Sequence, residues 1–368
     1  MSVFNRLVEF QKSLKVELVE LKGTCKLTGV PISIVCGVGE KTNHYLAELL
    51  YEPEYQVNSL GCTWLWNASR FTARIVPEAV VFFTEIGRQN KKLVFYGKNY
   101  FRIPLWVRGE VRLPLNESVT KKKDYREQIR KIRKAGFDFE VTRSRAQFED
   151  FYENMYVPQV SLSHGDSSQL TSMESLAKVF DKLELLVVKM GEQAVAGELI
   201  SYEDSTPKLR AVGVRDRNPE LLKKGALAAC YSFALQYLEQ QGFSDVNVGD
   251  SRGFINDGVL TYKRKWGQSI VEPRSIILLM KVMQNTPNAR ELLRNLPIIC
   301  ENGGALASMV FSDETELDAM RASPKFIEHH HIPGTSELVA YIMNKNMAYS
   351  KSNIVRLNPN VSKLPYKK

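Results

Sequence analysis

The hydrophobic and polar positions between residues 183 and 252 predict a small sheet interrupted by one helix. Three apolar runs, rich in valine, leucine and isoleucine, are separated by turn residues, which is typical of an antiparallel meander. These runs are Leu183–Met190, Ala194–Tyr202 and Leu209–Arg215. Apolar residues then recur at helical spacing from Lys224 to Gln241. A further strand is expected at Asp245–Ser251.

The sequence on either side of this region has strand and helix patterns of its own. Before residue 118 we expect a separate α/β lobe, with strands at Lys15–Gly23, Pro31–Gly39, Leu60–Asn67, Ala79–Ile86 and Lys92–Gly97 and a helix at His44–Tyr51. After residue 275 we expect a strand, a helix and a strand, at Ser275–Val282, Asn288–Leu296 and Ala305–Phe311. The chain is therefore predicted to have an N-terminal lobe (1–117), a second lobe (118–275) and a C-terminal extension packing on both (276–368).

A strongly basic helix is predicted at the start of the second lobe. Its apolar face consists of Tyr125, Ile129 and Ile132, and Gly136 stands where the helix would end. Between Lys121 and Lys134 the sequence has eight basic and two acidic residues. Such a surface either lies in solvent or holds a phosphate-bearing ligand. Under the second interpretation, Arg130 and Arg133 are the candidate substrate contacts.

Composition and charge narrow the class of protein. The 50 basic and 41 acidic residues give a net charge of +9, which favours anionic partners. The five cysteines are scattered and form no CxxC pair, as in reduced cytoplasmic proteins. We expect no transmembrane segment and no signal peptide, because long apolar runs are missing. We also expect no metal site, because His329–His331 has no companion ligands at suitable spacing.

One motif lies at the start of the predicted helix, and a second lies at the end of the strand that follows this helix. The first is the strand-to-helix junction Ala211–Ala229, in which Gly225 falls in the first helical turn. The second is Gly249–Gln268, in which Lys263 stands seven residues after Asn256 and shortly before an aromatic residue and a glycine. The order of strands and helix and these two motifs together resemble a known superfamily.

That superfamily is the GNAT acyltransferases, and the lysine in the second motif resembles its Fem-like and CelD-like branch most closely. The resemblance covers about residues 118–270 and is faint before that. It implies an α/β (α+β) fold with a GNAT-like mixed sheet flanked by helices. It also implies two GNAT-like lobes, of which the first is degenerate.

The resemblance implies an acyl-CoA co-substrate, and no tightly bound cofactor, at the junction of the third strand with the helix. Backbone amides within Ala211–Val214 would face the acyl carbonyl, and the start of the helix would face the pyrophosphate. The usual junction pattern is met only at Gly225, because Leu227 occupies a slot that favours glycine or alanine. The implied donor-binding residues are Val212, Val214, Lys223, Lys224, Gly225, Ala226 and Asn256.

Acyl transfer of this kind needs a base for the nucleophile and an acid for the leaving group. The candidate bases are Glu198, Asp250 and Asp257, and the candidate acids are Tyr262 and Lys263. Glu198 lies in the middle of a strand, where it is either buried, with a raised pKa, or on the solvated face of the sheet. Ser251 and Arg252 are candidate substrate contacts. A structural pair of Arg252 with Asp250 is the alternative.

These features together predict a cytoplasmic acyltransferase that moves an acyl group from acyl-CoA to an amine or hydroxyl. The acceptor would be an anionic sugar, amino-acid or cell-envelope precursor, as a small molecule or linked to a nucleotide, and DNA is not expected. One alternative is a Fem-like peptidyltransferase that uses aminoacyl-tRNA, the only interpretation that involves RNA. Another is a catalytically inactive GNAT-like binding module. The sequence does not determine the oligomeric state.

Overall fold

The computed structural model describes residues 14–87, 99–164, 170–343 and 350–357, and the chain forms two compact units. Unit 1 consists of residues 1–107, 252–257 and 273–368, and unit 2 of residues 108–251 and 258–272. The chain therefore leaves unit 2 twice, first through a short segment and then through the C-terminal residues. The strand expected at Lys92–Gly97 lies outside the described residues.

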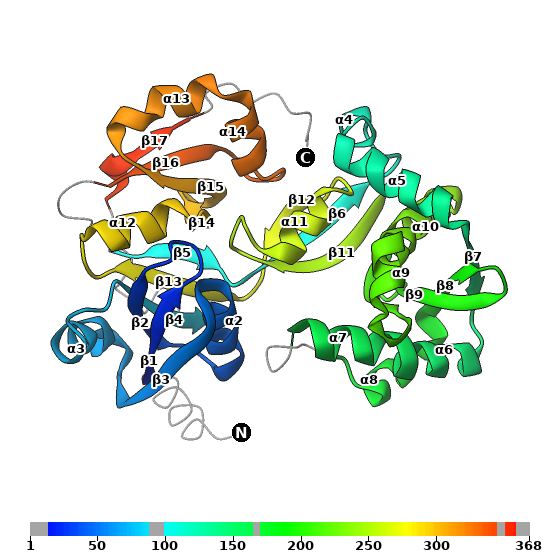
Figure 1. Cartoon of the computed structure of the whole chain (residues 1–368), viewed down its shortest axis with the longest axis horizontal. Helices are drawn as coiled ribbons and strands as arrows, with labels where there is room; N and C mark the ends of the chain where they lie inside the picture. The colour runs from blue at the N-terminus through cyan, green and yellow to red at the C-terminus, as the bar shows by residue number, and fades with distance from the viewer. Residues whose placement is uncertain (1–13, 88–98, 165–169, 344–349, 358–368) are drawn as a thin grey trace. The chain divides into compact units, whose positions relative to one another are not determined.

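The first sheet of unit 1 is mixed and six-stranded, in the order β3-β1-β2-β4-β13-β5 (Figure 1). Its strands are β1 (Lys15–Cys25), β2 (Pro31–Gly37), β3 (Tyr51–Trp64), β4 (Val81–Gly87), β5 (Phe101–Pro104) and β13 (Ile276–Val282). β2 and β4 are parallel, whereas β13 is antiparallel to both β4 and β5. The helix α2 (Glu40–Leu50) packs its buried leucines into the core of this unit. Residues expected in a C-terminal extension thus supply a central strand of this sheet.

The strand β3 begins well before the strand that the pattern of hydrophobic residues predicted. Only Leu60–Trp64 of β3 overlaps the strand expected at Leu60–Asn67, because the earlier part of β3 is polar and mostly exposed. β3 is an edge strand, so Pro53 is tolerated there despite its missing N–H. A short 3-10 turn and the helix α3 (Ala68–Ile75) follow it.

Unit 1 has a second, four-stranded sheet in the order β14-β15-β16-β17. Its strands are β14 (Ile298–Asn302), β15 (Ala305–Ser312), β16 (Leu338–Ile342) and β17 (Ile354–Arg356). Its helices are α12 (Pro287–Arg294), α13 (Leu317–Ala322) and α14 (Pro324–His330). Phe311 and Tyr341 pack edge-on against Phe101 of the first sheet, so both sheets share one core.

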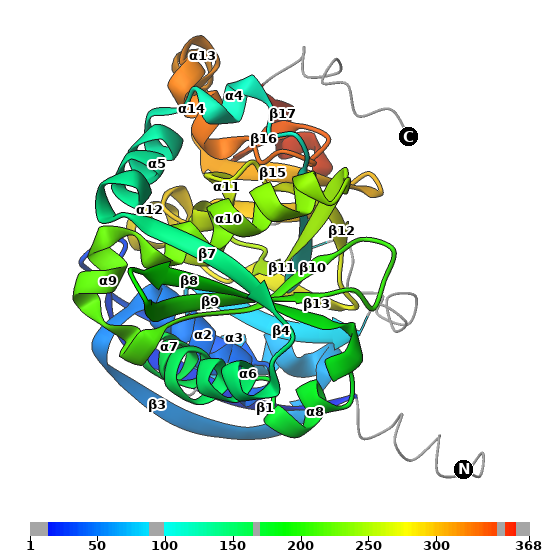
Figure 2. The same ribbon diagram turned by 90° about the vertical axis from the view of Figure 1, so that its right-hand side faces the viewer.

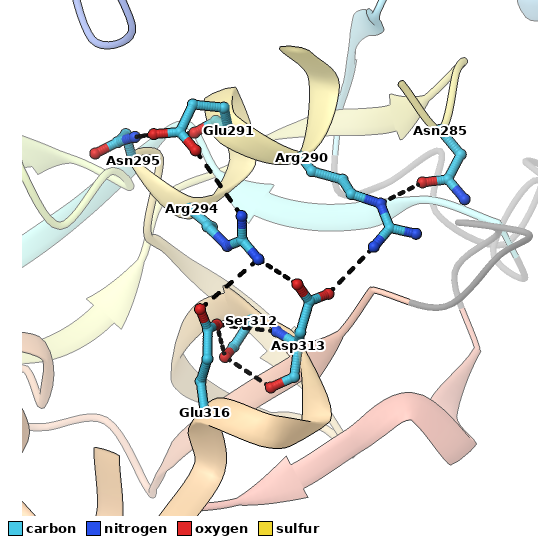
Figure 3. A network of polar contacts seen from close by, with 8 residues as sticks. All are labelled: Asn285, Arg290, Glu291, Arg294, Asn295, Ser312, Asp313 and Glu316. Carbon is cyan, nitrogen blue, oxygen red and sulfur yellow. Dashed lines mark hydrogen bonds and ion pairs between the residues drawn. The ribbon is translucent and has the colours of Figure 1, made fainter. Parts of the chain in front are cut away.

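Two arginines of α12 join this helix to the segment that precedes α13 (Figure 3). Arg290 Nη1 lies 3.3 Å from Asp313 Oδ1, and Arg294 also pairs with Asp313. Arg294 Nη2 lies 3.7 Å from Glu316 Oε1, while Glu316 Oε2 accepts the backbone N–H of Asp313 at 3.1 Å. Both carboxylates belong to the capping box of the short turn before α13, so the arginines connect α12 to a structured helix start.

Unit 2 is built on a seven-stranded sheet in the order β12-β6-β11-β10-β9-β8-β7. Its strands are β6 (Trp106–Arg112), β7 (Phe137–Thr142), β8 (Leu183–Met190), β9 (Gln193–Ser201), β10 (Lys208–Val214), β11 (Asp245–Arg252) and β12 (Ser269–Pro273). β8 to β10 form the predicted antiparallel meander, β7 adds a further antiparallel strand to it, and β10 is parallel to β11. The ends of β6, β11 and β12 run into unit 1.

Helices cover both faces of the meander (Figure 2). The helices α5 (Lys123–Ala135) and α10 (Ala226–Gln240) lie on one face, with α4 (Glu117–Thr120) before α5. The basic helix ends at Gly136, whose φ of +66° requires the conformational freedom of glycine, as predicted. The helix expected at Lys224–Gln241 is confirmed as α10, and a further helix, α9 (Pro219–Lys224), ends at Gly225 just before it.

The other face of the meander is covered by a helical segment that passes through Pro158. Proline usually ends a helix at the preceding residue, but this segment continues beyond it. The segment runs through α6 (Arg145–Phe151), a π-helical turn η4 (Tyr152–Tyr156) and α7 (Val157–His164), with α8 (Met173–Ala177) after it. The π-helical turn changes the hydrogen-bond register just before the proline, so the missing N–H of Pro158 does not interrupt a regular α-helical ladder.

Candidate active site

The parallel strands β10 and β11 separate soon after they meet. In the part of the chain that the structure describes they share one register pair, Lys208 with Asn247. Alternate N–H groups of a strand point to each of its neighbours, so part of the Leu209–Val214 backbone has no ladder partner on the β11 side. A bulge at Arg210 interrupts the register with β9 at the same place. This is where the sequence predicted amides that face an acyl carbonyl, within Ala211–Val214.

Glu198 lies at the centre of the sheet and is 1% exposed. It is paired across the sheet with Val212 and lies on the face covered by α10. The opposite face is also closed, because a Cβ on Gly197 would lie 2.7 Å from the ring of Phe151. The solvated position considered for Glu198 is therefore wrong. Burial raises its pKa well above the usual range, and the charge of Lys263 opposes this shift.

Lys263 is a buried cation close to this carboxyl group. It lies in α11 (Gly258–Arg264), is 6% exposed, and donates from Nζ to the carbonyl oxygen of Asp250 at 2.9 Å. Gly249 has a φ of +78°, and a Cβ there would lie 3.5 Å from the Lys263 Nζ. The bend in β11 therefore presents the Asp250 carbonyl to the lysine. The carboxylate of Asp250 itself is partly exposed.

Tyr262 points into an aromatic cluster. Its ring lies edge-on to Tyr231 at 5.3 Å and near Trp266 at 6.5 Å. Burial raises the pKa of Tyr262 above its usual range, and the charge of Glu198 adds to this. Glu198 Oε2 and the Tyr262 hydroxyl are both buried without a hydrogen-bond partner among the described residues. Unit 2 thus holds an acid, a cation and a phenol in one desolvated region.

The first turn of α10 is not an exposed anion-binding site. Its first N–H groups have no partner within the helix, as at any helix start. However, Gly225 and Ala226 are buried, and a Cβ on Gly225 would lie 3.4 Å from the Cβ of Lys131 in α5. Lys223 and Lys224 are exposed at the end of α9. The basic side chains are therefore accessible, whereas the glycine is covered.

Lys224 instead lines a pocket of about 520 Å³ beside α9. Arg215, Asp216 and Glu220 also line it, so it carries two basic and two acidic side chains. Arg215 is already bound to Asp150 at 2.6 Å. The charge of this pocket therefore does not select an anion.

A second pocket of unit 2, of about 530 Å³, lies between α5 and α10. Its walls are mainly apolar and include Tyr125, Ile129 and Trp266, with Arg133 and Glu239 among the lining residues. Arg130 is exposed and does not line it. The structure therefore does not bring the two candidate arginines to the same pocket.

Three candidate residues belong to unit 1 rather than to this region. Arg252 is buried and stacks on the rings of Tyr45 and Trp106. Asn256 is exposed and donates to the carbonyl of Asn295 at 3.4 Å. Asp257 accepts a hydrogen bond from the Tyr45 hydroxyl. An ion pair between Arg252 and Asp250 is not found among the described residues, which corrects the structural alternative considered for Arg252.

The sequence did not predict that two polar side chains of unit 2, those of Ser251 and Gln268, are buried. Ser251 Oγ is buried without a partner among the described residues, as are both polar atoms of the Gln268 amide. Gln268 packs so closely on β6 that a Cβ on Gly109 would lie 2.4 Å from its Cδ. A glycine inside a strand often marks such a close approach, so Gly109 was the available signal.

Among the residues that the structure describes, no group of three histidine, cysteine, aspartate or glutamate side chains is arranged to hold a metal ion. No helix in the same part of the chain is long and apolar enough to cross a bilayer.

Comparison with known proteins gives structural likenesses only. No family model matches the chain, and no curated protein sequence does. Solved structures similar to it include FemX (12% identity, TM-score 0.37, covering 68% of this chain and 81% of that one). Another is L-PGS from Bacillus licheniformis (14%, 0.35, 58% and 72%). A third is a GCN5-related N-acetyltransferase from Sphaerobacter thermophilus (13%, 0.33, 73% and 77%).

These proteins are of the kind expected from the sequence resemblance, but likenesses this weak carry no functional argument. The strand order of unit 2 is observed in this structure itself and does not depend on these likenesses. An antiparallel meander leads through a helix to a parallel strand that diverges from its neighbour. This arrangement of elements is GNAT-like.

Proposed function

We propose that the chain is an acyltransferase whose reaction takes place in unit 2, where β10 and β11 separate. One observation supports this proposal most directly. Glu198 pairs with Val212 of β10 in the sheet and is buried there, with the cation of Lys263 near it. Buried ionisable groups without partners are costly and are concentrated at functional sites. A purely structural core has no need of such a group in the middle of a strand.

Each of these groups has a role in the proposed acyl transfer. Unpaired amides of Ala211–Val214 stabilise the carbonyl oxygen as it gains negative charge, which is typically worth about 10²–10³ in rate. Glu198 accepts the proton of the attacking amine or hydroxyl in those molecules whose Glu198 is ionised, and its raised pKa makes that carboxylate a stronger base. Lys263 stabilises the leaving group through its charge.

The donor is proposed to be acyl-CoA. Lys223 and Lys224 are exposed near the first turn of α10 and suit its phosphates. Val212 and Val214 would supply the amides, with Gly225 and Ala226 at the helix start. Asn256 belongs to unit 1, so we do not include it in this donor site.

One observation favours a different donor. The beginning of α10 is covered by Lys131, whereas the outer surface of α5 is basic and exposed. Its exposed basic residues are Lys123, Arg126, Arg130, Arg133 and Lys134. A row of such charges suits a polyanion, so aminoacyl-tRNA is the second candidate donor.

The acceptor is proposed to be an anionic small molecule that carries an amine or hydroxyl. The apolar pocket between α5 and α10, with Arg133 among its lining residues, is the proposed acceptor site in unit 2. An arginine beside apolar walls suits a molecule with an acidic group on a less polar body.

The test is an assay of thiol release from acetyl-CoA with a pool of amine and hydroxyl acceptors. Wild-type protein should release thiol only when an acceptor is present, and Glu198→Gln should reduce the rate by about 10²–10⁴. Acceptor-independent release equal in both proteins would argue against the proposed role of Glu198. Binding of acetyl-CoA without any turnover would favour the inactive binding module.

A further inference from the structure

Two helices of unit 2 each contribute one row of side chains to the pocket of about 530 Å³ between them. On α5, Tyr125, Ile129 and Arg133 recur at four-residue spacing and so share one face of the helix. On α10, Gln236 and Glu239 share a face in the same way, three residues apart. The pocket therefore has a cation on one helix and an anion on the other.

The inner wall of this pocket is aromatic and closely packed. Trp266 is buried, and the ring of Tyr125 lies edge-on to it, with 5.7 Å between the ring centres. Leu115, Ile132 and Phe233 are among the other apolar lining residues. Such walls exclude water from a bound apolar group, and they strengthen the attraction between its charges and the charged groups beside them.

Arg133 and Glu239 are the two charged side chains that line the pocket in the part of the chain that the structure describes. Both are exposed, and neither forms an ion pair with another described residue. Burial raises the pKa of Tyr125, the charge of Arg133 lowers it, and the charge of Glu239 raises it. Both charges therefore act on the same aromatic side chain, and both can bind a ligand beside it.

This pair of charges narrows the class of acceptor. A phosphate group carries about two negative charges at neutral pH, which Glu239 would repel and Arg133 alone would have to balance. A plain carboxylic acid would leave Glu239 without a partner, and a plain amine would leave Arg133 without one. A molecule with one anionic group, one cationic group and an apolar body matches every part of the lining.

We propose that the pocket between α5 and α10 binds an α-amino acid with an apolar side chain, its carboxylate on Arg133, its ammonium group on Glu239 and its side chain against Tyr125 and Trp266. The inference rests on the proposed function in one respect, the assignment of the acceptor to this pocket. It narrows the acceptor from any anionic small molecule to a zwitterion.

The test measures binding to the whole protein by isothermal titration calorimetry, without any acyl donor. L-Phenylalanine is the probe, because its ring suits the aromatic wall, and it should bind saturably. 3-Phenylpropanoate lacks the amine and phenethylamine lacks the carboxylate, so each should bind at least about tenfold more weakly. Glucosamine 6-phosphate represents a phosphorylated acceptor and should not displace L-phenylalanine.

Two substitutions connect the binding to the proposed side chains. Glu239→Gln should weaken binding of L-phenylalanine at least about tenfold and leave the weaker binding of 3-phenylpropanoate unchanged. Arg133→Gln should weaken binding of both. Both residues are exposed, so the variants should fold. Glu153→Gln and Lys134→Gln are the matched controls, because these exposed residues of unit 2 do not line the pocket.

Three results would overturn the proposal. The first is that L-phenylalanine does not bind saturably. The second is that 3-phenylpropanoate binds as tightly as L-phenylalanine, or that glucosamine 6-phosphate displaces it, which describes an anion site. The third is that Glu239→Gln leaves binding of L-phenylalanine unchanged.

Failure of the proposed function gives a different result. L-Phenylalanine that binds as expected, but causes no thiol release from acetyl-CoA, would support this site and count against acyl transfer. Thiol release with another acceptor, by a protein that does not bind L-phenylalanine, would support acyl transfer and overturn this inference.

Discussion

At the scale of single residues, Lys263 and its neighbour Tyr262 face different surroundings. Lys263 is directed toward β11 and Tyr262 into the aromatic cluster. Lys263→Met should therefore lower kcat by about 10²–10⁴, because it removes a positioned charge. The Asp250 carbonyl also loses its donor, which should cost about 1–3 kcal/mol of stability. Steady-state kinetics and urea unfolding measure the two effects.

The controls for Lys263 lie in the same segment. Lys265→Met removes a half-buried lysine two residues away and should leave kcat nearly unchanged. Tyr262→Phe removes a hydroxyl that has no partner among the described residues and should cost less than about tenfold in kcat. If Tyr262→Phe were the more damaging change, the leaving-group role would belong to the tyrosine.

Glu198 should make the stability of the protein depend on pH. Burial raises its pKa, so the native state keeps a proton that the unfolded chain releases above about pH 4.3. The free energy of unfolding therefore falls as the pH rises from there toward the native pKa, by at most about 1.4 kcal/mol per pH unit. Glu198→Gln removes this loss. Urea unfolding at several pH values should show the variant gaining stability relative to wild type as the pH rises, and a constant difference would contradict the account.

At the scale of elements, the packing of β10 against the π-helical turn η4 depends on one glycine. A Cβ on Gly213 would lie 2.3 Å from the backbone carbon of Met155, which cannot move as a side chain can. Gly213→Ala should therefore destabilise unit 2 by about 3 kcal/mol, at the upper end for overpacking. Gly258→Ala is the control, since a Cβ there meets nothing within 4 Å, and it should stay within about 0.5 kcal/mol. Equal thermal shifts would show that the contact at Gly213 can relax.

The elements that could be predicted from the sequence are those with a strong hydrophobic period. β8 has the predicted bounds, and β9, β10 and β11 agree to within a residue or two. The first half of β3 was missed because an edge strand needs few buried side chains. The helix through Pro158 could not be predicted, because local propensity does not show a π-helical turn. The position of β13 inside the first sheet depends on contacts distant in the sequence.

The candidate site was predictable only in part, because it also depends on contacts between residues that are distant in the sequence. A mid-strand glutamate suggested Glu198, but only the packing of helices on both faces shows that it is buried. The placement of Arg252 in unit 1 could not be predicted, because β11 continues from one unit into the other without any change in its pattern. Gly225 is covered by Lys131 of α5, which lies almost a hundred residues earlier in the chain, so the local sequence does not show that this glycine is buried.

At the scale of the whole molecule, the excess of positive charge raises the question of which anion is bound. Arg130→Gln together with Arg133→Gln should raise KM for an anionic acceptor and leave the affinity for CoA unchanged. A matched loss for neutral and anionic acceptors would indicate a structural role for the helix instead. Tight RNA binding by wild type that weakens steeply with salt, and weakens in this variant, would favour the aminoacyl-tRNA donor.

The central claim is that the acyl donor binds along the separated edge of β10. The most direct measurement is an NMR titration of [15N]valine-labelled protein with acetyl-CoA. Val212 and Val214 lie in β10, and Val81 in β4 of unit 1 serves as the internal reference. The account predicts saturable shifts of the β10 amides and no change at Val81. Saturable binding of acetyl-CoA that leaves both β10 valines unshifted, or no binding at all, would contradict it.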